Sequence, residues 1–111
     1  MKGPSAFGKS GPQTALLAGM VLSNEPGYYQ ENCFGIRCEN LMVVVPRADG
    51  MLTFETITLA PFDHRLIDTS LLSSTERAWL DSYHARVYAT LAADLNGADR
   101  QWLQAATAAL Q

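Results

Sequence analysis

Two glutamates lie at the ends of apolar segments, and this placement could bring their carboxylates close together. Glu25 ends the run Met20–Asn24 at a Pro-Gly turn, and Glu39 lies near the start of a second strand-like run over residues 34–45. Carboxylate oxygens suit hard divalent cations, and a carboxylate can also carry a proton during hydrolysis. The pattern allows such chemistry. Spacing alone favours the plainer interpretation, a structural role on the solvated face of a half-buried strand.

Three further side chains could support these glutamates. Arg37 precedes Glu39 by two positions, hence on the same strand face, where it could hold that carboxylate in place. An ordinary surface ion pair is the equally weighted alternative. Tyr28 and Tyr29 follow the Pro-Gly turn and could line a substrate pocket, although we favour simple packing for tyrosines beside a turn.

The histidines and cysteines show no metal-ligand spacing. We interpret His64, in a turn, and His84, one position off the apolar stripe of a helix, as surface or boundary residues. Trp79 and Trp102 are interpreted as core anchors, with an interface role second. The two cysteines would lie about 16 Å apart in an extended strand, beyond the roughly 7 Å limit for a disulfide, so free thiols are expected at Cys33 and Cys38.

The first half of the chain predicts strands. Residues 1–14 are rich in Gly, Pro and Ser and indicate a loop. Strands are expected over 20–24, 34–45 and 51–59, with residues 28–33 as a return loop, and valines 43–45 are expected to be buried on both faces. These strands would form an antiparallel meander.

The second half predicts helices. Residues 61–72 are irregular, and Ser73 with Glu76 forms a capping-box pattern at the start of a helix. One apolar stripe then continues at spacings of three and four, through Leu80, Tyr83, Val87 and Leu91. Asn96-Gly97 ends this helix, and a shorter one from about Ala98 places four residues on one side, namely Trp102, Leu103, Ala106 and Leu110.

Composition bounds the class of protein. The chain has 111 residues, 48% of them hydrophobic and 17% charged, as expected for one globular domain. The net charge is −3 without a cluster of Lys or Arg, so nucleic acid is not an expected partner. The apolar runs fall far below the roughly twenty residues of a membrane span, and no signal-peptide pattern opens the chain. A cytoplasmic location is the expectation.

Three strings, SNEPGYY, FGIRCEN and FETITLAPFDHRLID, resemble the C-terminal end of aminopeptidase P, a dinuclear metallopeptidase of the methionine-aminopeptidase and prolidase superfamily with the pita-bread fold. The resemblance extends from about Gly3 to Leu110. It implies an α+β chain in which residues 1–60 are the C-terminal portion of the catalytic domain, an antiparallel meander. Residues 61–111 would then be the two-helix C-terminal extension of aminopeptidase P.

The resemblance also implies chemistry and partners. Glu25 matches the glutamate that binds one metal and shuttles the proton, and Glu39 matches the glutamate that bridges both metals. Two divalent ions, expected to be Mn²⁺, would serve hydrolysis of the N-terminal residue from peptides with proline second. The family's two Asp ligands and its His ligand have no counterpart, so we expect no activity from this chain alone. A non-enzymatic dimerisation or interaction module is the alternative, and a homo-oligomer is expected.

Overall fold

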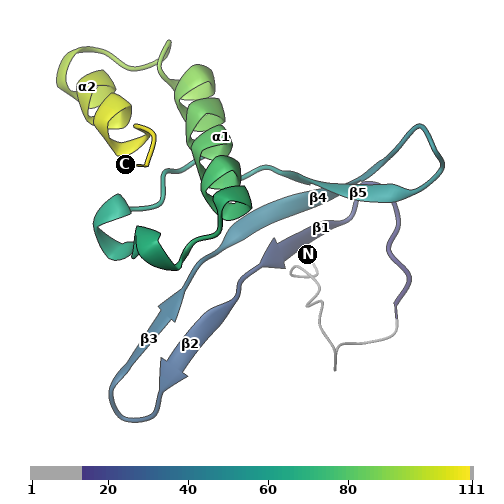
Figure 1. Ribbon diagram of the computed structural model, residues 1–111. Helices are drawn as coiled ribbons and strands as arrows, with labels where there is room; N and C mark the ends of the chain where they lie inside the picture. Colours follow the sequence, from purple (N-terminus) through teal and green to yellow (C-terminus); the bar gives the residue numbers. More distant parts are fainter. Residues whose placement is uncertain (1–13, 111) are drawn as a thin grey trace. The chain divides into compact units, whose positions relative to one another are not determined.

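The computed structural model describes residues 14–110, which form two compact units that meet in the sequence between Thr58 and Leu59 (Figure 1). We call the residues up to 58 the strand unit and those from 59 onward the helical unit. The loop predicted over residues 1–14 lies, apart from Thr14, outside the described residues. Within 14–110, none of the helices has the length and apolar character needed to cross a membrane.

The strand unit contains a three-stranded antiparallel sheet and a separate two-stranded hairpin (Figure 1). Strand β4 (Asn40–Pro46) lies at the centre of the sheet, between β1 (Val21–Asn24) and β5 (Leu52–Thr56). The hairpin consists of β2 (Gly27–Gln30) and β3 (Phe34–Arg37), in antiparallel pairing. The predicted antiparallel architecture is therefore confirmed, with more strands than expected.

The expectation of one strand over residues 34–45 is wrong, because β3 ends at Arg37 and β4 begins at Asn40. The predicted return loop over 28–33 is likewise largely strand β2. Pro26 explains the break, because it has no N–H to donate to a neighbouring strand. Its carbonyl still accepts a hydrogen bond from the Cys38 N–H at 3.0 Å. Both strands of the ladder are therefore interrupted where Pro26 and Cys38 face each other.

Only one face of the three-stranded sheet is buried. Leu22 and Val44 are 2% and 1% exposed, whereas Val43 and Val45, which point to the opposite face, are only half-buried. The prediction that all three consecutive valines are buried is therefore wrong. The alternation is that of an antiparallel sheet with one covered face.

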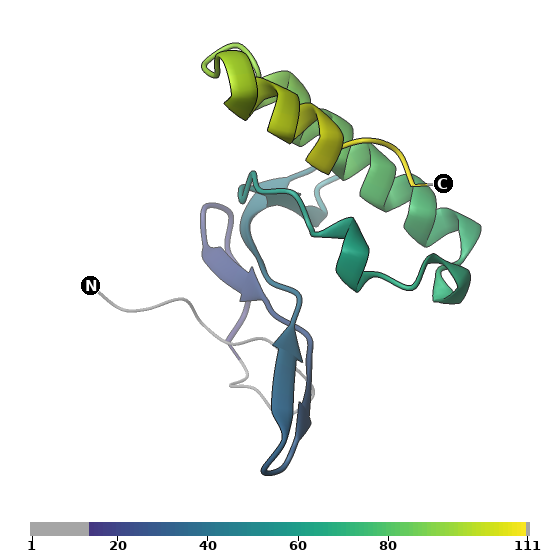
Figure 2. The ribbon, with the colours of Figure 1, turned by 90° about the vertical axis from the view of Figure 1, so that its left-hand side faces the viewer.

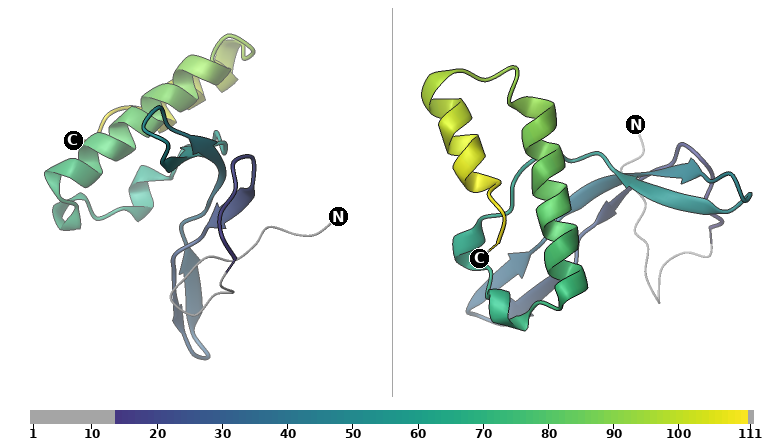
Figure 3. Two further views of the ribbon diagram at one scale, coloured as in Figure 1. Left: turned by 90° about the vertical axis from the view of Figure 1, so that its right-hand side faces the viewer. Right: turned by 45° about the horizontal axis from the view of Figure 1, so that its top comes forward.

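The helical unit begins with two single turns of 3₁₀ helix, η1 (His64–Leu66) and η2 (Thr69–Leu71). Asp63 and Asp68 cap them, each accepting the N–H two residues onward, from Arg65 and Ser70 at 3.0 Å. Two α-helices follow, α1 (Ser74–Leu91) and α2 (Gly97–Ala106), which lie side by side in the views of Figures 2 and 3.

The start of α1 is the predicted capping box. Ser73 Oγ accepts the Glu76 N–H at 3.3 Å, and the Glu76 carboxylate accepts the Ser73 N–H at 2.8 Å. The Ser73 N–H and the Ser73 hydroxyl both donate to the Glu76 carboxylate, and these two hydrogen bonds lower the pKa of Glu76 because they favour its charged form. The second helix begins at Gly97, one residue earlier than predicted, with a positive φ of 43° that glycine tolerates.

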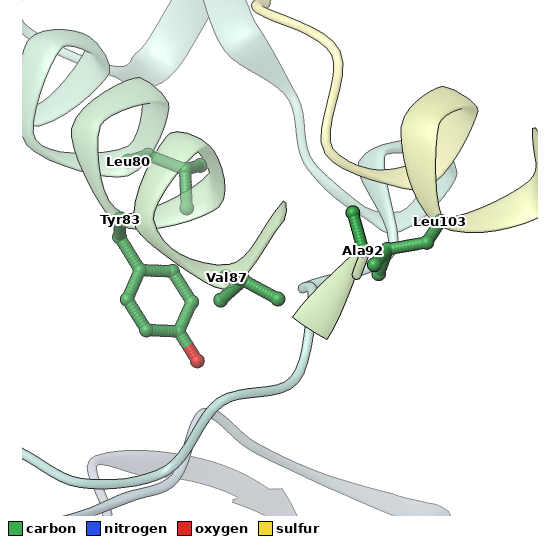
Figure 4. Packing of buried hydrophobic residues seen from close by; sticks show 5 residues of the cluster. All are labelled: Leu80, Tyr83, Val87, Ala92 and Leu103. Atoms are coloured by element: carbon green, nitrogen blue, oxygen red, sulfur yellow. The ribbon is translucent and has the colours of Figure 1, made fainter. Parts of the chain in front are cut away.

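The apolar core of the helical unit joins α1 to α2 (Figure 4). Its buried members are Leu80, Tyr83, Val87, Ala92 and Leu103. The predicted stripe of α1 is thereby confirmed for its first three residues, and its fourth, Leu91, packs against the cluster while partly buried.

Three single-residue predictions fail in this unit. Trp79 and Trp102 are 54% and 63% exposed and so do not anchor the core, although Trp79 stacks on Tyr83 at a centroid distance of 5.5 Å. His84, predicted at the surface or boundary, is 0% exposed. It is buried because both of its ring nitrogens find hydrogen-bond partners inside the unit.

Candidate functional site

The break between the sheet and the hairpin brings the two candidate glutamates together. Asn24 pairs with Asn40 at the end of the sheet, and Gly27 pairs with Arg37 at the start of the hairpin. Glu25 and Glu39 each adjoin the Asn24–Asn40 pair, so they occupy opposite positions in the interrupted ladder. Neither needs to follow the alternation of a regular strand.

Arg37 connects the two carboxylates. Its Nη1 lies 3.1 Å from Glu25 Oε2 and 3.5 Å from Glu39 Oε2. The three side chains are 42–47% exposed, so water screens these ion pairs and they contribute little to stability. Their value is geometric: one guanidinium orients two carboxylates toward a common region. Arg37 thus lies close to Glu39, as expected, although the single strand from which this proximity was predicted is interrupted between the two residues.

Tyr29 fixes the other side of that guanidinium. Arg37 Nε donates to Tyr29 Oη at 2.9 Å, and this hydrogen bond is the largest cause of the raised pKa of Arg37, ahead of the charge of Glu25. The Tyr29 ring lies across two glycines: a Cβ added at Gly35 would meet its Cδ1 at 2.7 Å, and one at Gly27 would meet its hydroxyl at 2.8 Å. Only glycine at these positions leaves room for the ring.

Tyr28 points to the other face of the hairpin. Its register partner is Ile36, and its ring lies 6.0 Å from that of Phe34, in a tilted arrangement. It is 61% exposed. The two tyrosines that the sequence offered together as pocket residues are thus separated, and only Tyr29 is joined to the arginine and glutamates.

Sequence reasoning missed Ser23. Its hydroxyl donates to Glu25 Oε1 at 2.6 Å, on the opposite carboxylate oxygen from the one that Arg37 contacts. Glu25 is therefore held from two sides. The available signal was the spacing of two residues on an extended segment, which places Ser23 and Glu25 on one face.

Whether these residues fit a metal centre depends on the number of ligands as well as on their type. Glu25 and Glu39 supply hard oxygen donors, the kind that Mg²⁺, Ca²⁺ or Mn²⁺ prefers. Across residues 14–110, however, no three or more His, Cys, Asp or Glu side chains are grouped so as to hold a metal ion. Both cysteines are free and exposed. The carboxylate pair thus matches part of a ligand set, and further ligands would be needed to complete it.

Comparisons with known proteins place this geometry in context. The model for metallopeptidase family M24 matches residues 2–46, which include both glutamates. A second model, for the C-terminal region of peptidase M24, matches residues 50–110. Together the two models match most of the strand unit and of the helical unit.

Curated relatives agree with these matches. Aminopeptidase P2 of Arabidopsis thaliana is 43% identical over a segment that covers 92% of this chain and 16% of the relative. A probable Xaa-Pro aminopeptidase P of Arthroderma gypseum is 45% identical over 78% of this chain and 15% of the relative. The chain thus spans about a sixth of the length of the curated relatives it matches.

A solved structure shows the same fold. It is described as X-prolyl aminopeptidase from Caenorhabditis elegans, a cytosolic enzyme with a di-nuclear active site, and is 33% identical with a TM-score of 0.80. The match covers 98% of this chain and 19% of that one. The predicted resemblance to aminopeptidase P and the predicted α+β part of a pita-bread fold are confirmed. Because the model of the C-terminal region alone matches more than half of its residues, the chain belongs to metallopeptidase family M24.

Proposed function

We propose that this chain is the C-terminal part of a dinuclear, metal-dependent Xaa-Pro aminopeptidase and that Glu25 and Glu39 are metal ligands. The observation that carries the proposal is the pair of carboxylates placed opposite each other in the interrupted ladder and joined by Arg37. Family membership supports it, as do the names of the relatives. The substrates would be peptides with proline as the second residue.

Each residue has a separate role in this proposal. Glu39 would bridge the two ions, while Glu25 would bind one of them and carry a proton between water and the leaving amine. Arg37 would position both carboxylates, and Tyr29 would hold Arg37 through its 2.9 Å hydrogen bond. A pair of divalent ions held there, which we propose to be Mn²⁺, would supply Lewis-acid activation of the peptide carbonyl.

We further propose that the chain by itself does not catalyse this hydrolysis. Two carboxylates leave most coordination positions of a divalent ion to water, and such sites bind weakly unless they are rigid or shared with a substrate. In isothermal titration calorimetry with Mn²⁺ at micromolar concentrations, the purified chain should show no stoichiometric binding. Its hydrolysis of a Xaa-Pro peptide should equal the background. Turnover that disappears in the Glu39→Ala variant would contradict this part of the proposal.

A chimera tests the ligand roles themselves. The segment of the nematode enzyme that matches this chain is replaced by the chain, and peptide hydrolysis and bound metal are measured on the purified protein. Glu25→Gln and Glu39→Gln should each abolish hydrolysis and lower the metal content. Glu31→Gln, the same change on an exposed glutamate in the hairpin turn, should alter neither. A fully active Glu39→Gln chimera would refute the assignment.

Location and assembly also belong to the proposal. We infer a cytoplasmic protein, since the nematode relative is described as cytosolic. We infer a homo-oligomer because β1 and β5 are the edges of the three-stranded sheet, and open edges invite pairing with another chain. Met51, Leu52 and Phe54 are 64%, 43% and 42% exposed at the β5 edge. The same exposed residues favour the second candidate function, a non-enzymatic interaction module, which a chimera without activity or metal would support.

A further inference from the structure

The two histidines of the chain face each other inside the helical unit. His64 Nε2 and His84 Nδ1 are 2.8 Å apart, and the ring centroids are separated by 4.7 Å with a tilt of 35°. His84 lies fully buried on α1, and His64 is half-buried in η1. The other nitrogen of the buried ring, Nε2, is 3.0 Å from the backbone nitrogen of Phe62. Both nitrogens of His84 are therefore used.

These contacts fix where the protons are. A backbone N–H can only donate, so His84 Nε2 is an acceptor and carries no proton. The proton of a neutral His84 is then on Nδ1, from which it is donated to His64 Nε2, and the proton of a neutral His64 is on its own Nδ1. A further proton would have to enter at His84 Nε2 or at His64 Nε2. Each of these atoms is already accepting a hydrogen bond, so protonation of either ring breaks one of the two contacts.

The contacts hold a defined piece of chain, residues 60–66, against helix α1. Tyr83 precedes His84 and binds the same segment, since its hydroxyl donates to the Ala60 carbonyl at 2.7 Å and accepts the Ala60 N–H at 3.3 Å. The segment also forms one wall of a cavity of about 360 Å³. This cavity is lined by Pro61, Phe62, Asp63, His64 and Arg65, and by Trp102, Ala105 and Ala106 of α2.

Few charged groups act on the pair. Beside His64 in the 60–66 segment, Asp63 and Arg65 are bound to each other at 2.6 Å. On α1, Asp81 acts on His84 through its charge while it accepts the Leu110 N–H at 2.8 Å, and the Tyr83 ring lies 5.7 Å from the His84 ring. The α2 residues that line the cavity do not titrate. Burial is the main cause that lowers the pKa of His84 below 6.5, followed by His64, and Asp81 opposes the shift.

We propose that His64 and His84 form an acid-sensitive latch that fastens residues 60–66 to helix α1 and releases them when the pair takes up a proton. The latch does not depend on the metal site or on the proposed function. A histidine in the unfolded chain titrates near 6.5, whereas burial keeps His84 neutral down to a lower pH in the folded protein. Its stabilising effect is therefore complete above about pH 6.5 and is lost as the pH falls through the lowered pKa.

The test is urea unfolding of the full chain between about pH 8 and pH 5, monitored by tryptophan fluorescence. Both tryptophans lie in the helical unit, so the signal reports on that unit. Below about pH 6.5 the unfolding constant of the wild type should rise by about tenfold per pH unit, the limit for uptake of one proton. His84→Gln, which keeps an oxygen acceptor for the Phe62 N–H, should lose this increment.

Tyr83→Phe is the matched control. It removes the two hydrogen bonds to Ala60 but no group that titrates in this range, because tyrosine has a pKa of about 10. It should be less stable than the wild type at every pH and have the wild-type pH dependence. Equal pH dependence in the wild type and in His84→Gln would overturn the latch.

Histidine NMR decides the matter even if His84→Gln does not fold. Long-range proton–nitrogen spectra of the wild type at about pH 8 should show both rings with the proton on Nδ1. His84 should titrate below 6.5, and the Phe62 amide signal should move with it. A proton on Nε2 of His84, or a His84 pKa at or above 6.5, would contradict the proposal.

Discussion

Replacing Leu103 by alanine tests how α2 is held in the helical unit. Leu103 is 2% exposed and belongs to the cluster that contains Val87 and Ala92. A buried Leu→Ala change loses the transfer free energy of the removed atoms and leaves a cavity, which together cost about 3 kcal/mol. A unit spanning residues 59–111 has a total free energy of unfolding of about 3–8 kcal/mol. The single change should therefore remove a third or more of that stability.

The measurement is urea unfolding monitored by tryptophan fluorescence, with the circular dichroism of the helices as a second signal. With a denaturant slope of about 1 kcal/mol/M, typical for a small unit, the midpoint should fall by about 3 M or the variant should be unfolded without urea. Leu66→Ala makes the same chemical change at a residue that is 85% exposed. It should stay within about 0.5 kcal/mol of the wild type. If the free energies of unfolding of the two variants differ by less than about 1 kcal/mol, Leu103 does not anchor α2 in the apolar core.

Three more predictions concern the cap, an ion pair and assembly. Ser73→Ala should lower the free energy of unfolding of the helical unit by about 1 kcal/mol in thermal melts, because the first turn of α1 loses its cap; an equal loss in Ser82→Ala, which leaves the cap intact, would speak against this. Hydrogen bonds from Arg65 lower the pKa of Asp63 to about 2. Arg65→Gln should return it toward 3.8 in a carboxyl NMR titration, and since a depressed pKa stabilises only above the unfolded value, the pair's contribution should vanish as the pH falls from about 3.8 to about 2. Size exclusion with light scattering should show a dimer or larger assembly, whereas a monodisperse monomer that binds no hydrophobic dye would rule out the open sheet edge as a cause of association.

Local patterns predicted the helices well because the information lies within a few residues. Ser73 and Glu76 are three apart, and the stripe from Leu80 to Val87 repeats at helical spacing. Neither depends on distant chain. The exposure of Trp79 and Trp102 does depend on distant parts of the chain. Their large apolar area alone could not reveal that smaller side chains fill the core.

The strands were harder to predict, since their bounds depend on pairing. The alternation from Phe34 to Asn40 predicts one continuous strand. The interruption comes from the paired segment on the other side of the ladder, in which Pro26 lies at the break. His84 is a similar case. Its burial depends on an N–H at Phe62 and a ring at His64, both about twenty residues away. The helical repeat places His84 on the same face as Leu80 and Val87, but it does not reveal these distant partners.

Within the site, the strand pattern predicted that Glu25 and Glu39 lie close together, the family resemblance supplied their expected metal-binding roles, and the register gives the proximity a physical basis. The contact of Arg37 with Glu39 could be predicted from spacing, whereas its hydrogen bond to Tyr29 could not. Tyr29 and Arg37 are diagonal neighbours across two strands, and the sequence indicated a loop where the first of those strands lies.

The packing of the Tyr29 ring on Gly27 and Gly35 has a consequence for how this hairpin can vary. A methyl group at Gly35 would enter the space of the ring, and one at Gly27 would also meet the Ile36 carbonyl at 2.9 Å. A ring displaced in this way would withdraw its hydroxyl from Arg37. Any variant that gains a side chain at Gly35 should therefore also exchange Tyr29 for something smaller, so that the two positions change together, while Gly27, limited by backbone as well, should hardly change.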